Sequence, residues 1–319
     1  MKKKQVLFQE WGLSSFRKNN ERMLHIYSDT QSGESGAIGT ELESTFSPTI
    51  TRARELNVIL KKKGIHSKDM TALLENIRVH ILNQCSPLLY CKPVYERPLT
   101  VIELKLSPIS MKGYKNPNIR EEIEKIMTTL KFWGFTDSRE EISLQPNLDV
   151  AIFGSNITEI KATIEKFLWF IFNNVDFFNC LSFRMGSYQK NSDMYALLGD
   201  PLANLSHENR VKEFIKSKNS LLEVLYETHT TERRALSMTI NSNAKRVIEL
   251  RYFGTKLDTA AYFVVIEFSH ALAKFCLFNS LENCTLQNFC LFIDKNKSEY
   301  SELYYFLTQG NNYCVKYFT

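Results

Sequence analysis

The chain of 319 residues is 44% hydrophobic and 24% charged, a composition typical of a globular protein with a sizeable core. It contains only 12 glycines and 8 prolines, which argues against long flexible linkers and a loop-dominated fold. The formal net charge of +5 suits anionic ligands such as nucleotides, but it is too small to indicate nucleic-acid binding by itself.

Three features predict a cytoplasmic location. The seven cysteines are odd in number and form no CxxC pair, so reduced thiols are the simplest interpretation. The start of the chain, MKKKQVLFQEWG, is basic but lacks the sustained apolar run of a secretory signal. The most apolar run, residues 260–278, is interrupted by Glu267, His270 and Lys274, which favours a buried helix over a membrane span.

The N-terminal part is predicted to contain strands and a helical hairpin. Alternating apolar residues predict strands at 22–28 and 37–46, separated by the flexible-looking loop SDTQSGESG. Leu, Ile and Val recur at helical spacing in two stretches within about 50–85, and Gly64 between them is a stop signal. A further strand is predicted at 99–106, which reads LTVIELKL.

The rest of the chain mixes helices and strands without a regular βαβ order. The predicted elements are helix 116–134, strand 142–154, helix 156–175, an irregular polar segment at 190–220, strands 232–241 and 245–253, and C-terminal helices at about 259–308. Asn116 or Asn118 is the predicted cap of the first of these helices, Gly134 its predicted end, and Thr158 the predicted cap of the next. This arrangement indicates an α+β fold with a mainly antiparallel sheet. Its helices are expected to cover one face and leave the other for a site.

Four predicted strands carry acidic or other polar residues at alternating positions. Side chains alternate between the two faces of a strand, so residues two apart share a face. The pairs are Glu41 and Glu43 in GTELES, Glu103 and Lys105 in VIELKL, Asn147 and Asp149 in LQPNLDVA, and Glu249 and Arg251 in VIELRYF. For one strand, a solvated outer face is the simpler explanation. The recurrence on four strands predicts that these side chains converge on the uncovered face of one sheet.

Converging carboxylates predict a site for divalent cations. Carboxylates at close range oppose each other's ionisation unless a cation compensates them. Mg²⁺ prefers oxygen ligands, is usually held by one or two carboxylates, and leaves positions for phosphate oxygens. Two or three Mg²⁺ ions would account for five acidic strand positions. Arg251 would then contact a phosphate or a substrate carboxylate through its fork of donors.

These motifs, in their order along residues of about 37–280, resemble those of the glutamate–cysteine ligase-like carboxylate–amine ligases, a superfamily that includes the amidoligases. Their opening strand is similar to IGTELE, their second acidic strand to VIELKLSP, and their late Glu-x-Arg strand to VIELRYFGTKLD. The Gln-x-Asn-Leu-Asp strand of the plant-type enzymes resembles LQPNLDVAIF. Two arginine motifs of the family fall where this chain has LSFRMGSY and ERRALSM.

The resemblance implies a single domain over residues 1–319, with a curved, mainly antiparallel sheet whose funnel-like face binds ATP and Mg²⁺. It also implies a reaction in which a substrate carboxylate attacks the γ-phosphate of ATP. An amine then displaces phosphate from the acyl phosphate to form an amide. The expected partners are an amino acid or a peptide that supplies the carboxylate and the amine. No membrane partner is expected, and the oligomeric state is left open.

By the same resemblance, the metal ligands are Glu41, Glu43, Glu103, Asp149 and Glu249. The catalytic residues are Arg251 and Arg184. The residues that hold ATP are Arg251, Arg233, Arg234 and Asn147.

Two alternatives stay open. Amidoligases usually have a His-x-His strand where this chain has Asp149-Val150-Ala151, and this favours a catalytically inactive nucleotide- or peptide-binding regulatory protein on the same fold. The hairpin predicted within 50–85, with Lys61–Lys63 between its helices, also fits a helix–turn–helix that binds nucleic acid. A hairpin that covers the sheet is the simpler explanation, because short Gly-containing turns between helices are common.

Overall fold

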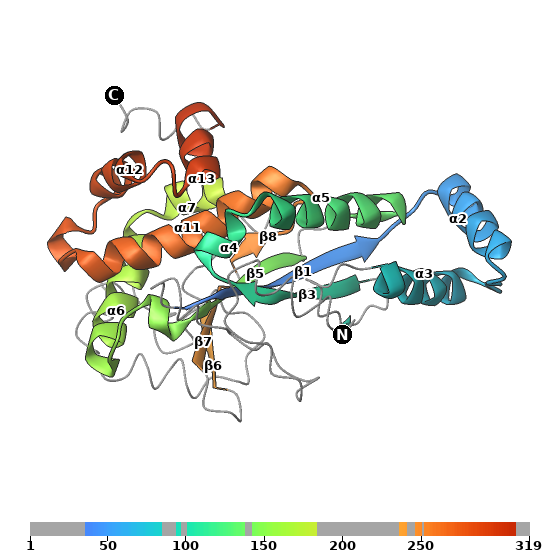
Figure 1. Ribbon diagram of the computed structural model, residues 1–319, viewed down its shortest axis with the longest axis horizontal. Helices are drawn as coiled ribbons and strands as arrows, with labels where there is room; N and C mark the ends of the chain where they lie inside the picture. The colour runs from blue at the N-terminus through green and yellow to red at the C-terminus, as the bar shows by residue number, and fades with distance from the viewer. Residues whose placement is uncertain are drawn as a thin grey trace, which may run out of the picture.

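An antiparallel sheet forms the centre of the protein (Figure 1). The computed structural model describes residues 36–84, 94–96, 101–137, 142–183, 236–240, 246–250 and 252–310. Its strands are β1 (Ile38–Phe46), β2 (Val94–Glu96), β3 (Val101–Ile109), β4 (Phe135–Thr136), β5 (Ser143–Asp149), β6 (Leu236–Ile240), β7 (Arg246–Leu250) and β8 (Phe253–Gly254). The order is β2-β3-β1-β5-β7-β6, with β4 paired to β1 and β8 to β5. Every pairing among these strands is antiparallel, which confirms the predicted α+β class.

Long helices pack along one face of this sheet, and a hairpin of two further helices lies at one end of it. The helices are α2 (Ile50–Lys62), α3 (Met70–Gln84), α4 (Met111–Tyr114), α5 (Pro117–Phe132), α6 (Ile157–Asn173), α7 (Val175–Leu181), α11 (Thr259–Phe278), α12 (Leu286–Lys295) and α13 (Ser301–Tyr305), with short turns η1 (Val150–Ile152), η3 (Leu281–Asn283) and η4 (Phe306–Gly310). α5 and α11 lie on the same side of the sheet in Figure 1, and α6 packs against α11. β6 and β7 turn away from the plane of β1 and β3 on the other side.

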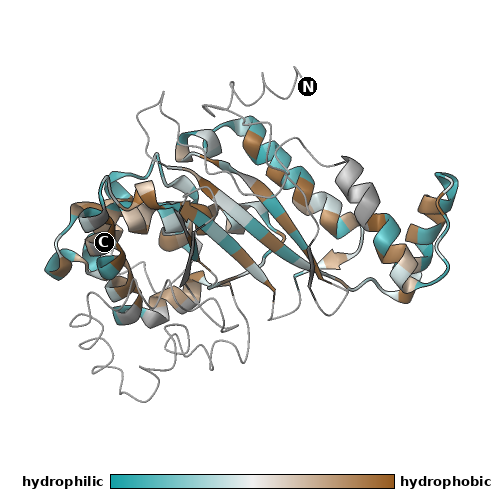
Figure 2. Ribbon diagram, turned by 90° about the horizontal axis from the view of Figure 1, so that it is seen from below, coloured by the Kyte–Doolittle hydropathy of each residue, from teal (hydrophilic) through white to brown (hydrophobic). Residues whose placement is uncertain are grey.

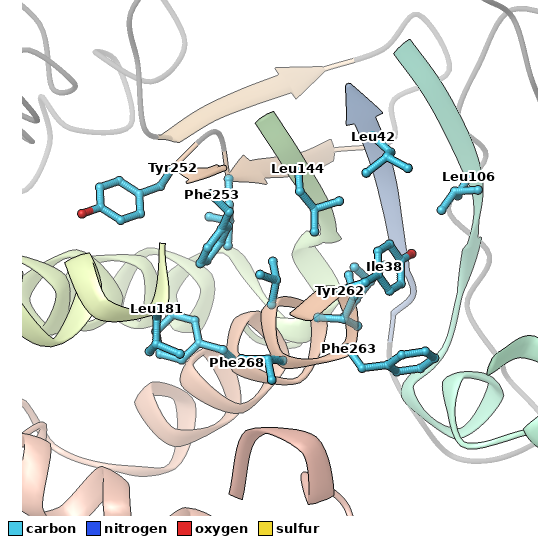
Figure 3. Close-up of a cluster of buried hydrophobic side chains, with 14 of the residues drawn as sticks. Ile38, Leu42, Leu106, Leu144, Leu181, Tyr252, Phe253, Tyr262, Phe263 and Phe268 are labelled. Carbon is cyan, nitrogen blue, oxygen red and sulfur yellow. The ribbon is translucent and has the colours of Figure 1, made fainter. Parts of the chain in front are cut away.

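The sheet face toward α11 is apolar because alternate residues of each strand project onto it. Ile38 and Leu42 of β1 and Leu144 of β5 point toward α11, where Tyr262 and Phe268 meet them (Figure 3). None of these five residues is more than 1% exposed. Burial of one large apolar side chain contributes about 1.5–3 kcal/mol, so this layer is a main source of stability.

α11 is the central helix of this core. By length and composition it is apolar enough to cross a membrane, but 78% of its most apolar window is buried inside the protein. The prediction of a buried helix is therefore confirmed for α11. Its one buried carboxylate, Glu267, is compensated. Oε1 accepts from Lys115 Nζ at 2.6 Å, and Oε2 accepts from the Leu303 backbone N–H at 2.9 Å.

A bulge interrupts the pairing of β1 with β3. Thr40 lies opposite Leu106 and Ile38 opposite Ile109, so Ser107 and Pro108 face the single residue Gly39. Proline has no N–H to donate to a ladder and is therefore tolerated at such a bulge. The bulge at Ser107 and Pro108 thus shifts the register at the end of β3, whereas the pairs from Thr40 and Leu106 onward stay in regular register.

Local signals set the ends of the helices. Asn116 caps α5 by accepting from the Asn118 N–H at 3.0 Å, which confirms Asn116 as the cap. Gly134 follows α5 with a φ of +85°, in the left-handed region that favours glycine. The cap predicted at Thr158 is wrong, because Asn156 accepts the N–H groups of Thr158 and Glu159 at 3.1 and 3.0 Å and begins α6 instead.

The hairpin predicted within 50–85 is present as α2 and α3, but it lies at one end of the sheet rather than over its face (Figure 1). Arg52 of α2 ties it to the end of α5. Its guanidinium donates to the Phe132 carbonyl oxygen at 2.6 Å and lies 4.8 Å from the centroid of the Phe132 ring. The predicted strand 22–28 and segment 190–220 lie outside the described residues.

Candidate functional site

Polar side chains from four strands meet on the sheet face opposite α11. The directly opposed pairs are Glu43 and Glu103, Glu41 and Lys105, Glu41 and Gln145, and Asn147 and Glu249. Opposed residues of an antiparallel pair project from the same face, so these seven residues form one continuous set, which we call the polar face. Figure 2 views the sheet from this side, where hydropathy alternates along the strands. The predicted placement on one face of the sheet is confirmed for Glu41, Glu43, Glu103, Lys105, Asn147 and Glu249.

Lys105 lies between two glutamates at the centre of the polar face. Its Nζ is 2.9 Å from Glu41 Oε1 and 2.7 Å from Glu103 Oε1. The side chains of Glu41 and Glu103 are 13% and 6% exposed, whereas that of Lys105 is 28% exposed. Two carboxylates are therefore withdrawn from water around one ammonium that retains contact with solvent.

This arrangement shifts the pKa values of the cluster. Burial, and then the nearby charge of Glu41, raises the pKa of Glu103 to about 8, although Lys105 opposes the shift. Burial by itself would lower the pKa of Lys105, but its interactions with Glu41 and Glu103 outweigh burial and raise it. Lys105 therefore stays charged at neutral pH, whereas burial and the neighbouring Glu41 oppose ionisation of Glu103.

Glu43 is held by hydrogen bonds from β5. Its Oε2 accepts from the backbone N–H and the hydroxyl of Ser143 at 2.6 and 2.7 Å, and its Oε1 accepts from Gln145 Nε2 at 3.0 Å. Gln145 Nε2 also donates to Ser143 Oγ at 2.6 Å. All three residues are buried. These donors compensate the carboxyl group for its removal from water, so β5 helps to position Glu43.

The remaining predicted residues of β5 and β7 lie beside this centre. Asn147 Nδ2 is 3.4 Å from Glu41 Oε1 and lies directly opposite Glu249, which is half-buried. Asp149 stands at the end of β5, where its Oδ1 accepts from the Ala151 N–H at 3.0 Å and caps η1. This cap ends the strand at Asp149. The prediction that the strand extends to residue 154 is therefore wrong.

The predicted arginines do not fall within the described ranges. Arg184, Arg233, Arg234 and Arg251 all lie outside them. Their assignment to phosphate and carboxylate groups therefore stays a prediction.

On the polar face, the carboxylate oxygens of Glu41 and Glu103 are suitable ligands for one hard cation such as Mg²⁺. Within the described ranges, no three His, Cys, Asp or Glu side chains are gathered into a metal cluster. Glu41 and Glu103, however, are two carboxylates whose buried charges oppose each other, and Mg²⁺ is commonly held by one or two carboxylates with water or phosphate completing its octahedron. Glu41 and Glu103 therefore fit one ion, and Asn147 lies beside them with its amide Nδ2 donating to Glu41 Oε1.

Sequence reasoning missed two residues of this site and the role of a third. Gln145 and Ser143 precede Asn147 at alternating positions of the same strand. The criterion that selected Asn147 would therefore also have selected them. The sequence pattern correctly predicted the sheet face on which Lys105 lies, but it did not predict the ion pairs of Lys105 with Glu41 and Glu103.

Comparison with known proteins adds no family assignment, because no family model and no curated protein matches this sequence.

Proposed function

We propose that this protein is an ATP- and Mg²⁺-dependent carboxylate–amine ligase that forms an amide bond through an acyl phosphate. The observation that carries the proposal is the contact of Glu41, Lys105 and Glu103 on a sheet face that also presents Asn147 and Glu249. We further propose that this face forms the wall of a funnel-like site in a cytoplasmic enzyme.

In this proposal several residues of the polar face and the four predicted arginines have distinct tasks. When bound, Mg²⁺ neutralises the phosphate oxygens of ATP, and ATP supplies the phosphoryl group that activates the substrate carboxylate. Glu41 and Glu103 would hold the cation, Glu249 would bind a further Mg²⁺ as the resemblance implies, and Asn147 would orient a polar group of the nucleotide. Arg251, Arg184, Arg233 and Arg234 bind phosphate or carboxylate oxygens. The burial of Glu103 excludes water, which strengthens these electrostatic contacts.

Phosphate release tests this function. The purified protein is mixed with ATP, Mg²⁺ and a panel of amino acids and short peptides, and phosphate is measured for the wild type, Glu41→Gln and Glu249→Gln. We expect one substrate pair to stimulate release, and both variants to abolish it. Glu121→Gln, on an exposed position of α5, is the matched control and should retain full activity. An absence of both stimulated release and nucleotide binding would refute the proposal.

One observation favours a second candidate, a catalytically inactive nucleotide- or peptide-binding protein. Lys105 already compensates Glu41 and Glu103, and Asp149 caps η1, so three of the expected metal ligands already have structural partners. A thermal shift with ATP and Mg²⁺ separates the candidates, because a ligand that binds only the folded state raises the melting temperature. A shift without turnover on any substrate supports the inactive protein.

The nucleic-acid alternative depends on the hairpin of α2 and α3. Lys61–Lys63 are exposed at its turn, but the first two turns of α3, Met70–Ile77, contain no Lys or Arg to contact a phosphate backbone. The expected observation for this alternative is a DNA affinity that falls steeply with salt and with replacement of Lys61–Lys63 by Ala.

A further inference from the structure

The ammonium of Lys105 contacts Glu41 and Glu103, the two carboxylates that would also bind a divalent cation on the polar face. Its Nζ lies within 3 Å of both Glu41 Oε1 and Glu103 Oε1. These are the same two carboxylates that fit a divalent ion. An ammonium and a divalent cation cannot occupy this place together, because both need the same carboxylate oxygens and their charges repel each other.

Lys105 is also the member of this cluster that is best able to move. Its side chain is 28% exposed, against 13% for Glu41 and 6% for Glu103, and its ammonium ends a flexible four-carbon stem. If the ammonium left without replacement, the buried pair of Glu41 and Glu103 would lose the positive charge that compensates it, which is strongly unfavourable. The ammonium therefore stays until another cation arrives.

We propose that Lys105 acts as an internal substitute for the divalent cation and competes with it for Glu41 and Glu103. This inference rests on the proposed function and concerns how the site is loaded. A cation that enters displaces the ammonium, which then needs an anionic partner. The phosphates of a nucleotide are such a partner and bind a lysine ammonium well.

Competition of this kind couples the two ligands. Without a nucleotide, a cation must displace Lys105 into water and therefore binds weakly. With a nucleotide present, the displaced ammonium gains a phosphate partner, so the cation binds more tightly. By thermodynamic linkage, the cation must raise the affinity for nucleotide by the same factor. Lys105 would thus favour loading of the site with both ligands together.

Mn²⁺ binding to the full-length protein tests the inference directly. Mn²⁺ is titrated and its free fraction followed by electron paramagnetic resonance, with and without a non-hydrolysable ATP analogue. The proteins are the wild type, Lys105→Met and the control Lys125→Met, whose side chain is 64% exposed on α5. Circular dichroism establishes that each variant is folded. If Lys105→Met does not fold, Lys105→Gln replaces it, and the nucleotide dependence of the wild type is an independent measurement.

We expect Lys105→Met to bind Mn²⁺ at least about tenfold more tightly than the wild type in the absence of nucleotide, because a nearby positive charge is removed. The analogue should tighten Mn²⁺ binding to the wild type and to Lys125→Met, but much less to Lys105→Met. Equal Mn²⁺ affinities of the wild type and Lys105→Met would overturn the competition and leave the proposed function intact.

Two further outcomes separate the inference from the function. If Lys105→Met binds Mn²⁺ but the wild type does not, even with the analogue, the competition is supported and the ligase function is refuted. If none of the proteins binds Mn²⁺, both the competition and the metal-dependent function are refuted.

Discussion

Ser143 donates both its backbone N–H and its hydroxyl to the same oxygen of Glu43, at 2.6 and 2.7 Å. The two residues are 4% and 5% exposed. Ser155 makes the same pair of bonds to Glu159, at 2.8 and 2.7 Å, on the exposed surface at the start of α6. The protein therefore contains one hydrogen-bond motif in two surroundings, one buried and one solvated.

Replacement of each serine by Ala compares the two surroundings. Ser143→Ala leaves the buried Glu43 carboxylate without one of its donors, and we expect it to lower the free energy of unfolding by about 1.5–3 kcal/mol. Ser155→Ala should have little effect, because water replaces the lost hydroxyl. Urea unfolding measures both. Equal effects would contradict the structural role assigned to Ser143.

Lys115 and Glu267 provide a second test of buried charge. Lys115→Met removes the ammonium 2.6 Å from Glu267, which is 1% exposed. We expect a loss of about 2–3 kcal/mol, less than for a fully buried pair because the Lys115 side chain is 32% exposed. Burial already raises the pKa of Glu267, although Lys115 opposes this. The loss should therefore diminish at acid pH, where Glu267 is neutral. Lys125→Met, at an exposed pair, is the control for urea unfolding.

The pKa of Glu103 predicts a component of the pH dependence of stability. Its value rises from 4.5 to about 8 on folding, so between these values the folded protein keeps a proton that the unfolded chain has released. Stability therefore falls as pH rises through this window, by up to about 1.4 kcal/mol per pH unit for one proton. Glu103→Gln should remove this component. The measurement is the difference between wild type and variant in urea unfolding from acid to alkaline pH, and a constant difference would be the contrary result.

Ala substitutions at two glycines that follow helices distinguish the effect of backbone strain from the effect of steric crowding. Gly64 and Gly134 have φ values of +77° and +85°. An Ala at either position would be held in the left-handed conformation, which costs about 1–2 kcal/mol. A Cβ at Gly134 would also lie 2.9 Å from Pro48 Cβ, whereas at Gly64 it would meet nothing within 4 Å. Gly134→Ala should therefore lower the melting temperature more than Gly64→Ala does, and a larger effect at Gly64 would contradict the described packing.

The sequence predicted which face of the sheet carries Glu41, Glu43 and Glu103, because alternation along a strand is a local property. It did not predict which residues lie opposite each other. The register of Glu41 with Lys105 depends on pairing between distant strands, which meet a bulge at Ser107 and Pro108. The contact of Lys105 with both carboxylates therefore became visible only in the folded chain.

The same distinction applies to the helices. The apolar pattern of α11 correctly indicated a buried helix, but the partner of Glu267 is Lys115, far away in sequence. The start of α6 was misplaced because Asn156 and Thr158 are both common capping residues, and the sequence contains no signal that chooses between them.

The most direct test of the account is a crystal structure of the protein with Mn²⁺ and a non-hydrolysable ATP analogue, with the metal located by its anomalous scattering. We expect a Mn²⁺ ion bound by Glu41 and Glu103, with the Lys105 ammonium moved onto a phosphate of the nucleotide. A polar face that keeps both Lys105 ion pairs and holds no metal, with the nucleotide bound elsewhere or not at all, would contradict it.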